Sequence, residues 1–174
     1  IGRVMREKGI EEYLEAAYAL KKEYSNIYFH VYGFCEEAYE DRLKKLQEQG
    51  VIQYHGMVKD MAEVFETINC SVLPSYHEGM ANSLLEAAAS GRPVIASNIT
   101  GCRETFDEGV SGFGFQVKDS RALIGALRKF LSLTTEERQQ MGLAGRKKVE
   151  TEFDRNIVIN AYINEIEHIS KGVK

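Results

Sequence analysis

The sequence predicts an α/β domain built on a doubly wound parallel sheet. Short apolar stretches rich in β-branched residues alternate with longer stretches whose apolar residues recur every three or four positions. Strands that are short, apolar and separated by helices are typical of a parallel sheet covered by helices on both faces. The 174 residues are enough for one such domain with a full core.

The elements follow one another in a regular alternation. The opening "IGRV" has the pattern of a strand end, so we expect the chain to be a piece of a longer protein. Strands are then expected at 26–34, 51–56, 70–75, 92–97 and 112–117. Asn82 is expected to cap a helix that begins near Ser83. The other helices are expected at about 10–24, 37–49, 60–68, 119–132, 135–151 and 155–170.

Composition excludes several classes of partner. The net charge is -4, from 22 basic and 26 acidic residues, which gives no electrostatic reason to expect nucleic acid as a partner. No apolar run reaches the roughly 18 residues of a membrane span. Cys35, Cys70 and Cys102 lie far apart without a C-x-x-C pair, as expected for reduced thiols of a cytosolic protein that form no metal site.

The segment "HEGMANSLLEAAASGRPVI" carries the most informative charges. Ligands of a doubly wound sheet bind outside the carboxyl ends of the strands, and this segment follows the expected strand 70–75. Glu86 falls among apolar residues, which indicates a buried helix in which a carboxylate needs a partner. Backbone N–H groups or the positive end of the helix could supply that partner, and so could the hydroxyls of a ligand.

Glu78 and Gly79 extend this pattern upstream. Glu78 alone could be a solvated loop charge, but Gly79 allows a close approach of backbone to a ligand. The amide groups of a helix N-terminus favour an anion, whereas two flanking carboxylates suit hydroxyls. The combination predicts a ligand that carries both phosphate and hydroxyl groups, such as a nucleotide sugar.

These motifs resemble those of a known enzyme family. "SYHEGMANSLLEAAASGRPVIASNITGCRE" is similar to the donor-binding E-x7-E signature of family 4, or group 1, retaining glycosyltransferases of the GT-B fold. "IGRVMREKGI" resembles the family's strand-end R…K-G motif, and "GVSGFGFQV" resembles its N-G-L-L-V strand. The resemblance covers the chain and implies a Rossmann-like C-terminal half, a donor-binding domain over 1–174 without its N-terminal acceptor domain. Finer similarity points to bacterial enzymes of capsule, O-antigen or other glycan assembly.

The resemblance also implies roles for individual residues. Arg3 and Lys8 would hold the diphosphate of the donor, and Glu78 would accept hydrogen bonds from the donor sugar; these three form the expected catalytic set. Glu86 would bind the ribose hydroxyls. The remaining donor-binding positions are Gly79, Met80 and Ala81 over the sugar, Asn82, Ser83 and Leu84 at the phosphate-binding helix start, and Met57 and Val58 at the base.

No metal is expected. The chain has no Asp-x-Asp pair, so Arg3, Lys8 and the helix start near Ser83 are the positive groups available to a departing diphosphate. The resemblance adds retention of anomeric configuration and a UDP-sugar donor. It implies a glycan or lipid-linked acceptor bound by the missing half, and a cytoplasmic enzyme that associates with the inner face of the membrane through that half. It also implies that the apolar last helix returns toward the missing half.

Other interpretations remain open at this point. A sugar-nucleotide epimerase or a phosphorylase of the same architecture would keep the same phosphate and hydroxyl ligands, and a non-catalytic nucleotide-sugar-binding domain is a further alternative. Arg3 and Lys8 alone could be surface cations, and Met80 and Ala81 depart from the residues common in the family. A dinucleotide-binding module is disfavoured because "GVSGFG" reverses the spacing of G-x-G-x-x-G and precedes a strand.

Overall fold

The computed structural model describes residues 1–172 and confirms an α/β fold with parallel strands. Five strands alternate with seven α-helices, and two short 3-10 helices lie in the strand-end loops of the described chain. The strands are β1 (His30–Val31), β2 (Gln53–Tyr54), β3 (Ser71–Leu73), β4 (Val94–Ser97) and β5 (Gly112–Phe115). The helices are η1 (Arg6–Lys8), α1 (Ile10–Glu23), α2 (Glu40–Glu48), α3 (Met61–Thr67), α4 (Asn82–Ala89), η2 (Arg103–Thr105), α5 (Ser120–Ser132), α6 (Thr135–Glu152) and α7 (Arg155–Gly172).

The strands form two parallel sheets instead of the single sheet expected from the sequence. β1 pairs with β2, and β3, β4 and β5 pair in that order, with Val94 of β4 opposite Ser71 on one side and Gly112 on the other. The opening residues run beside β1, where Val4 forms a parallel bridge with Cys35. The strands are also shorter than expected, most of all β1, because much of 26–34 has no regular ladder partner among the described residues.

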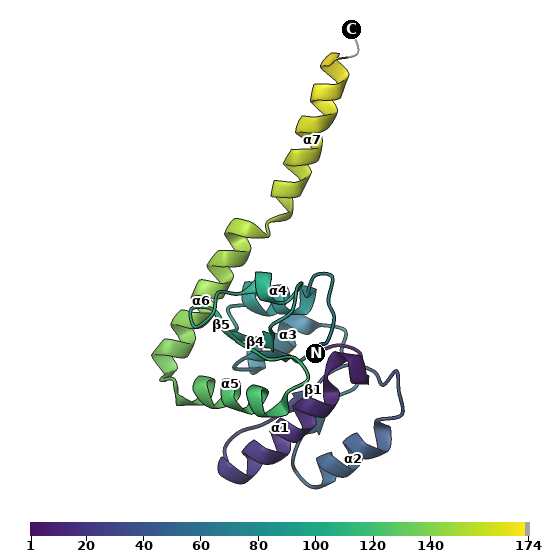
Figure 1. The fold of residues 1–174 in the computed structure, drawn as a ribbon, viewed down its shortest axis with the longest axis vertical. Coiled ribbons are helices and arrows are strands. Elements are labelled where there is room, and N and C mark those ends of the chain that lie inside the picture. The colour runs from purple at the N-terminus through teal and green to yellow at the C-terminus, as the bar shows by residue number, and fades with distance from the viewer. Residues whose placement is uncertain (173–174) are drawn as a thin grey trace.

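Helices cover both faces of the three-stranded sheet. Along β4, Ile95 lies in a core shared with α1 and α5, while Val94 and Ala96 lie in a second core shared with α4. Successive strand residues point to opposite faces, so this alternation places the two cores on opposite sides of the sheet. In Figure 1, α4 and α5 lie on opposite sides of β4 and β5, and α1 packs against α5. The doubly wound arrangement is therefore confirmed for this sheet.

Local capping accounts for several helix starts. The carboxylates of Asp60 and Asp119 accept hydrogen bonds from amides at the first turns of α3 and α5. Thr134 and Glu137 form a reciprocal capping box at the start of α6. The prediction that Asn82 caps α4 is wrong, since α4 already includes Asn82, follows Ala81 and has no side-chain cap.

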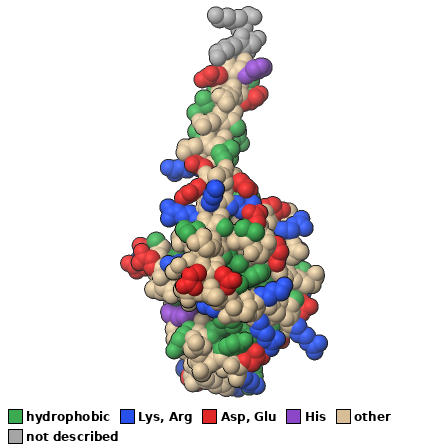
Figure 2. Space-filling model, turned by 90° about the vertical axis from the view of Figure 1, so that its left-hand side faces the viewer, with side chains coloured by type: hydrophobic (Ala, Val, Ile, Leu, Met, Phe, Trp, Pro, Cys, Tyr) green, Lys and Arg blue, Asp and Glu red, His purple; other side chains and the backbone are tan. Residues whose placement is uncertain are grey.

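The last helix stands away from the body of the domain. α6 packs against α4, whereas α7 continues beyond it as an arm (Figure 1). Apolar side chains remain exposed along this arm (Figure 2), among them Val158, Tyr162 and Ile166. This exposure agrees with the expectation that the last helix is not buried against its own sheet. Within residues 1–172, none of the helices combines the length and apolarity that crossing a membrane requires.

Candidate functional site

An ion pair joins two of the sequence motifs at the carboxyl ends of the strands. The Nζ of Lys8, at the end of η1, lies 2.7 Å from the Oε1 of Glu78, in the loop after β3. Both side chains are largely shielded, with 24% and 13% of their surfaces exposed. A cation and a carboxylate in direct contact attract each other more strongly when they are partly shielded from water. The structure therefore brings together two of the three residues expected in the catalytic set.

Two glycines, Gly9 and Gly101, allow other backbone segments to approach the loop after β3 closely. Gly9 has a φ of 71°, and a Cβ there would lie 2.0 Å from the carbonyl oxygen of Pro74. Gly101 has a φ of 87°, and a Cβ there would lie 2.3 Å from the carbonyl oxygen of Glu78. The Gly101 carbonyl also accepts a hydrogen bond from the Ala81 amide at 2.8 Å. Only glycine fits both the backbone conformation and the space at these contacts, which fix Glu78 beside Lys8.

Tyr76 joins the loop after β3 to η1 and to the first turn of α1 through two hydrogen bonds. Its amide donates to the carbonyl of Glu7 at 2.8 Å, and its hydroxyl donates to the Oε1 of Glu12 at 2.7 Å. Burial and the bond to the Glu12 carboxylate raise the pKa of Tyr76 to about 12, so it remains a hydrogen-bond donor at neutral pH. Sequence reasoning missed both Tyr76 and Glu12. No motif marks this contact, because the two residues meet only through tertiary packing.

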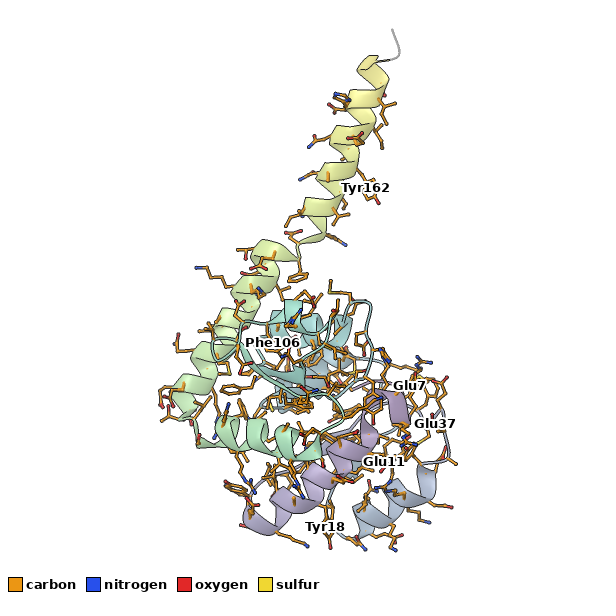
Figure 3. The ribbon with its side chains drawn as sticks, viewed as in Figure 1. Glu7, Glu11, Tyr18, Glu37, Phe106 and Tyr162 are labelled. Atoms are coloured by element: carbon orange, nitrogen blue, oxygen red, sulfur yellow. The ribbon has the colours of Figure 1, made fainter. Side chains whose placement is uncertain are left out.

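Figure 3 shows how carboxylates gather near this edge. Glu7, Glu11 and Glu37 lie close together, on η1, on α1 and in the loop before α2. The backbone amide of Arg6 donates to a carboxylate oxygen of Glu37 at 3.0 Å, which ties that loop to η1. The pKa of Glu11 is lowered because hydrogen bonds from Arg42 and Tyr39 outweigh its partial burial. The carboxylates of Glu11 and Glu37 therefore have hydrogen-bond partners of their own.

Arg3 has a different partner from Lys8. Its Nη1 lies 2.6 Å from the Oε2 of Glu36, and both side chains are substantially exposed, by 50% and 40%. An exposed pair of this kind exchanges readily with water or with an incoming anion. Among the described residues, Arg3 therefore pairs with Glu36, and the structure describes no direct contact between Arg3 and the Lys8–Glu78 pair.

The start of α4 differs in part from the sequence expectation. Glu86 is exposed, so the prediction that it lies in a helix buried all round is wrong; α4 buries only one side, through Leu84, Ala87 and Ala88. The Leu84 amide already donates to the carbonyl of Ala81 at 2.9 Å. Within residues 1–172, the Ser83 amide has no such backbone partner, and it is therefore available to an anion.

The other expected donor-binding residues lie around these groups. Gly79 and Asn82 are exposed, and Met80 has 44% of its surface exposed, whereas Ala81 is buried beneath them. Met57 has 72% of its surface exposed in the loop after β2, next to the half-buried Val58. Their positions follow strand ends, as the sequence predicted. The geometry on its own assigns them no ligand.

Cys102 lies below the ion pair. Its thiol is fully buried, and burial together with the nearby Glu78 charge raises its pKa to about 12. A thiol of this kind is a packing group and a poor nucleophile at neutral pH. Across residues 1–172, the structure holds no cluster of three or more His, Cys, Asp or Glu side chains arranged to bind a metal ion.

Comparison with known proteins agrees with the motifs. A family model described as "Glycosyl transferases group 1" matches residues 1–148. The chain is 28% identical, over 174 residues, to an N,N'-diacetylbacillosaminyl-diphospho-undecaprenol alpha-1,3-N-acetylgalactosaminyltransferase of Campylobacter jejuni, covering 99% of this chain and 45% of that protein. It is 29% identical, over 162 residues, to the capsular polysaccharide biosynthesis glycosyltransferase CapM of Staphylococcus aureus, covering 91% of this chain and 42% of that protein.

A solved structure supports the fold. A single-site mutant of S. aureus TarM, in complex with Fondaparinux, alpha-GlcNAc-glycerol and UDP, superposes with a TM-score of 0.83 at 20% identity, covering 94% of this chain and 34% of that one. Such a likeness establishes a shared fold, the Rossmann-like C-terminal domain of GT-B glycosyltransferases. The chain spans less than half the length of the curated relatives described above.

Proposed function

The chain belongs to the group 1 glycosyltransferases, and from this premise we propose that it binds the nucleotide-sugar donor of a sugar-transfer reaction. The observation that carries the proposal is the contact between Lys8 and Glu78, which joins the two motif loops at the strand ends. A cation and a carboxylate held side by side match a donor whose charged diphosphate adjoins a hydroxyl-rich sugar. The reaction proposed for the whole enzyme is transfer of a hexose or N-acetylhexosamine with retention of configuration.

Lys8 would release part of its contact with Glu78 and neutralise the diphosphate. Negative charge grows on the diphosphate as the bond to the sugar breaks, so a positive group already in place lowers the barrier. The free amide of Ser83 and the positive end of α4 would add to this stabilisation. Arg3 would join them by exchanging its exposed contact with Glu36. These groups supply positive charge without a metal, so we propose metal-independent transfer.

The two motif carboxylates would bind hydroxyls at different parts of the donor. Glu78 lies beside Lys8 and would accept hydrogen bonds from the transferred sugar, under the backbone of Gly79 and Met80. Glu86 is exposed one turn into α4 and would accept hydrogen bonds from the ribose. Met57 and Val58 would contact the base through their backbone groups. Neither carboxylate is proposed as a nucleophile.

Two relatives and one solved structure guide the choice of donor and acceptor. TarM is described in complex with UDP, which supports a UDP-sugar as the donor. The C. jejuni relative is named for a diphospho-undecaprenol acceptor and the S. aureus relative for capsular polysaccharide biosynthesis. We therefore propose a glycan or lipid-linked acceptor in bacterial surface-glycan assembly, at the inner face of the membrane. The acceptor would be bound outside this domain, and the exposed face of α7 would contact the acceptor-binding half.

Isothermal titration calorimetry on this chain tests the donor proposal. We expect binding of UDP and UDP-sugars, weaker binding of GDP and no binding of NAD. A preference for NAD would contradict the proposal, because the site would then bind a second nucleoside where the proposal places the donor sugar. For the whole enzyme, a panel of UDP-sugars in buffer with and without EDTA tests metal independence. Loss of transfer in EDTA that added Mg²⁺ or Mn²⁺ restores would contradict it.

A further inference from the structure

Lys118 has a backbone conformation that its side chain does not favour. Among residues 1–172, it is the only non-glycine residue with a positive φ, of 60°. It lies in the loop between β5 and α5, directly before the Asp119 that caps α5. Glycine adopts this left-handed conformation freely, whereas a residue with a Cβ adopts it under strain. Strained residues of this kind cluster at functional sites, so the Lys118 side chain is a candidate for a role at this strand end.

The charged end of Lys118 lies over the ring of Tyr76. Its Nζ is 4.7 Å from the ring centroid, which is within the range of a cation–π contact. Within the described part of the chain, no carboxylate forms an ion pair with Lys118. The contact joins the loops after β5 and β3, although β4 separates these two strands in the sheet.

A buried carboxylate holds the other end of Tyr76. The Tyr76 hydroxyl donates to the Oε1 of Glu12 at 2.7 Å, and only 9% of the Glu12 surface is exposed. The Oε2 of Glu12 is buried and has no hydrogen-bond partner within the described residues. Tyr76 therefore supplies the one hydrogen bond that these residues give the Glu12 carboxylate. Loss of that bond would leave a buried polar group unsatisfied, so the two side chains depend strongly on each other.

Tyr76 lies two positions before the carboxylate that is proposed to bind the sugar. The backbone around Glu78 is held on one side by the Tyr76 amide, which donates to the Glu7 carbonyl at 2.8 Å. It is held on the other side by the Ala81 amide, which donates to the Gly101 carbonyl at 2.8 Å. Because so few residues separate the Tyr76 ring from Glu78, a shift of the ring would move Glu78 as well.

We propose that Lys118 and Glu12 are positioning residues for Glu78 and that both act through Tyr76. Lys118 would hold the face of the ring and Glu12 its hydroxyl, so that Glu78 is in place before the sugar arrives. A group that is already ordered does not have to be ordered on binding, which favours the ligand that it contacts. The inference rests on the proposed contact of Glu78 with the donor sugar.

Hydrogen exchange without ligand tests the positioning separately from sugar binding. Lys118→Met keeps the apolar stem and removes the charge, whereas Lys118→Arg keeps a cation over the ring. We expect Lys118→Met to speed exchange at the Tyr76 and Ala81 amides about threefold or more, and Lys118→Arg to stay near the wild-type rates. The Ser71 amide, bonded to the Pro93 carbonyl at the start of β3, is the internal control. Unchanged exchange at Tyr76 and Ala81 in Lys118→Met, or an equal increase at Ser71, would overturn the proposal.

Calorimetry with UDP, UDP-glucose and UDP-N-acetylglucosamine tests the consequence for the donor. We expect Lys118→Met to reduce the preference for a UDP-sugar over UDP about threefold while UDP affinity stays unchanged, and Lys118→Arg to restore the preference. An equal loss for UDP and UDP-sugars would overturn the proposal, because Lys118 would then contact the diphosphate itself. A wild-type chain without any preference for UDP-sugars would instead contradict the sugar contact of Glu78, and hydrogen exchange would still decide the positioning.

Two further variants separate the position of the loop from its stability. Tyr76→Phe leaves the Glu12 carboxylate buried without its donor and should lower both the melting temperature and the preference for a UDP-sugar. Combining Tyr76→Phe with Glu12→Leu removes the buried carboxylate too, so the melting temperature should recover. The sugar preference should stay low, because the ring remains unanchored. Recovery of the sugar preference together with the melting temperature would overturn the proposal, since the pair would then contribute to stability alone.

Discussion

Lys8 and Glu78 are 70 positions apart in the sequence, yet their charged groups lie 2.7 Å from each other at the strand ends. The contact depends on loops from two different sheets, because Lys8 follows the opening segment beside β1 and Glu78 follows β3. It therefore reports on the correct assembly of the domain as well as on the proposed donor site.

Lys8→Met and Glu78→Gln should change UDP affinity in opposite directions. Lys8→Met keeps the apolar stem but removes the positive charge, and should weaken UDP binding about tenfold or more. Glu78→Gln removes a negative charge near the diphosphate and should tighten UDP binding about fivefold, while weakening the preference for a UDP-sugar over UDP. Calorimetry measures both variants. Uridine, which lacks phosphate, is the control ligand, and an equal loss of uridine binding would point to misfolding.

Glu86→Gln should weaken binding of the nucleotide without unfolding the domain. The Glu86 side chain is exposed and has no described ion pair, so its substitution should change the free energy of unfolding by less than about 0.5 kcal/mol. Loss of a charged hydrogen-bond acceptor for the ribose should weaken UDP binding about tenfold. The wild type should also prefer UDP to 2',3'-dideoxy-UDP, and Glu86→Gln should lose that preference. An unchanged preference would remove Glu86 from the site.

Gly101→Ala should disrupt the close contact between the backbone of Gly101 and the loop that carries Glu78. The new Cβ would lie 2.3 Å from the Glu78 carbonyl oxygen, so the backbone must move. Gly50→Ala is a matched control, because Gly50 also has a positive φ, of 69°, but open space around it. Gly50→Ala should cost about 1 kcal/mol for its conformation alone, whereas Gly101→Ala should cost clearly more and weaken UDP-sugar binding. Thermal unfolding and calorimetry compare the two; equal effects would mean that the contact is unimportant.

His30 should make the domain less stable in mild acid. Burial, and then the neighbouring His55 charge, lower the pKa of His30 below its ordinary value of 6.5. The unfolded chain therefore binds a proton at a higher pH than the folded chain, and stability falls as pH decreases through 6.5 toward the folded pKa. Urea unfolding between about pH 5 and 7 should show this decrease, and His30→Gln should reduce it. An unchanged decrease in His30→Gln would contradict this role of His30.

Removing α7 should leave the rest of the domain folded. A chain that ends at residue 153 loses a helix whose Val158, Tyr162 and Ile166 are exposed. We expect its melting temperature and UDP affinity to stay close to those of the longer chain. Its self-association, measured by sedimentation at increasing concentration, should be lower because an exposed apolar surface is removed. A large fall in melting temperature would show that α7 contributes to the domain's own core.

The sequence predicted the elements and their order well because the periodicity of apolar residues is local. The predicted helices 119–132 and 135–151 agree within a residue or two with α5 and α6, where Asp119 and Thr134 provide recognisable caps. The alternation of strands and helices also placed Lys8 and Glu78 in loops that follow strand ends. The contact of Tyr76 with Glu12 could not be predicted, since it arises only when α1 packs beneath the loop. The exposure of Glu86 was also missed, because an alanine-rich helix suggests burial all round while small side chains tolerate a solvent-facing side.

The connection between α6 and α7 gives the arm a mechanical property. Only Phe153 and Asp154 separate the two helices, and α7 then continues for 18 residues, or about 27 Å at 1.5 Å per residue. A rotation of about 10° at this two-residue joint would swing the far end of the helix by roughly 5 Å, because displacement grows with distance from the pivot. Small torsional changes near Phe153 would therefore suffice to move the far end of α7 relative to the body of the domain.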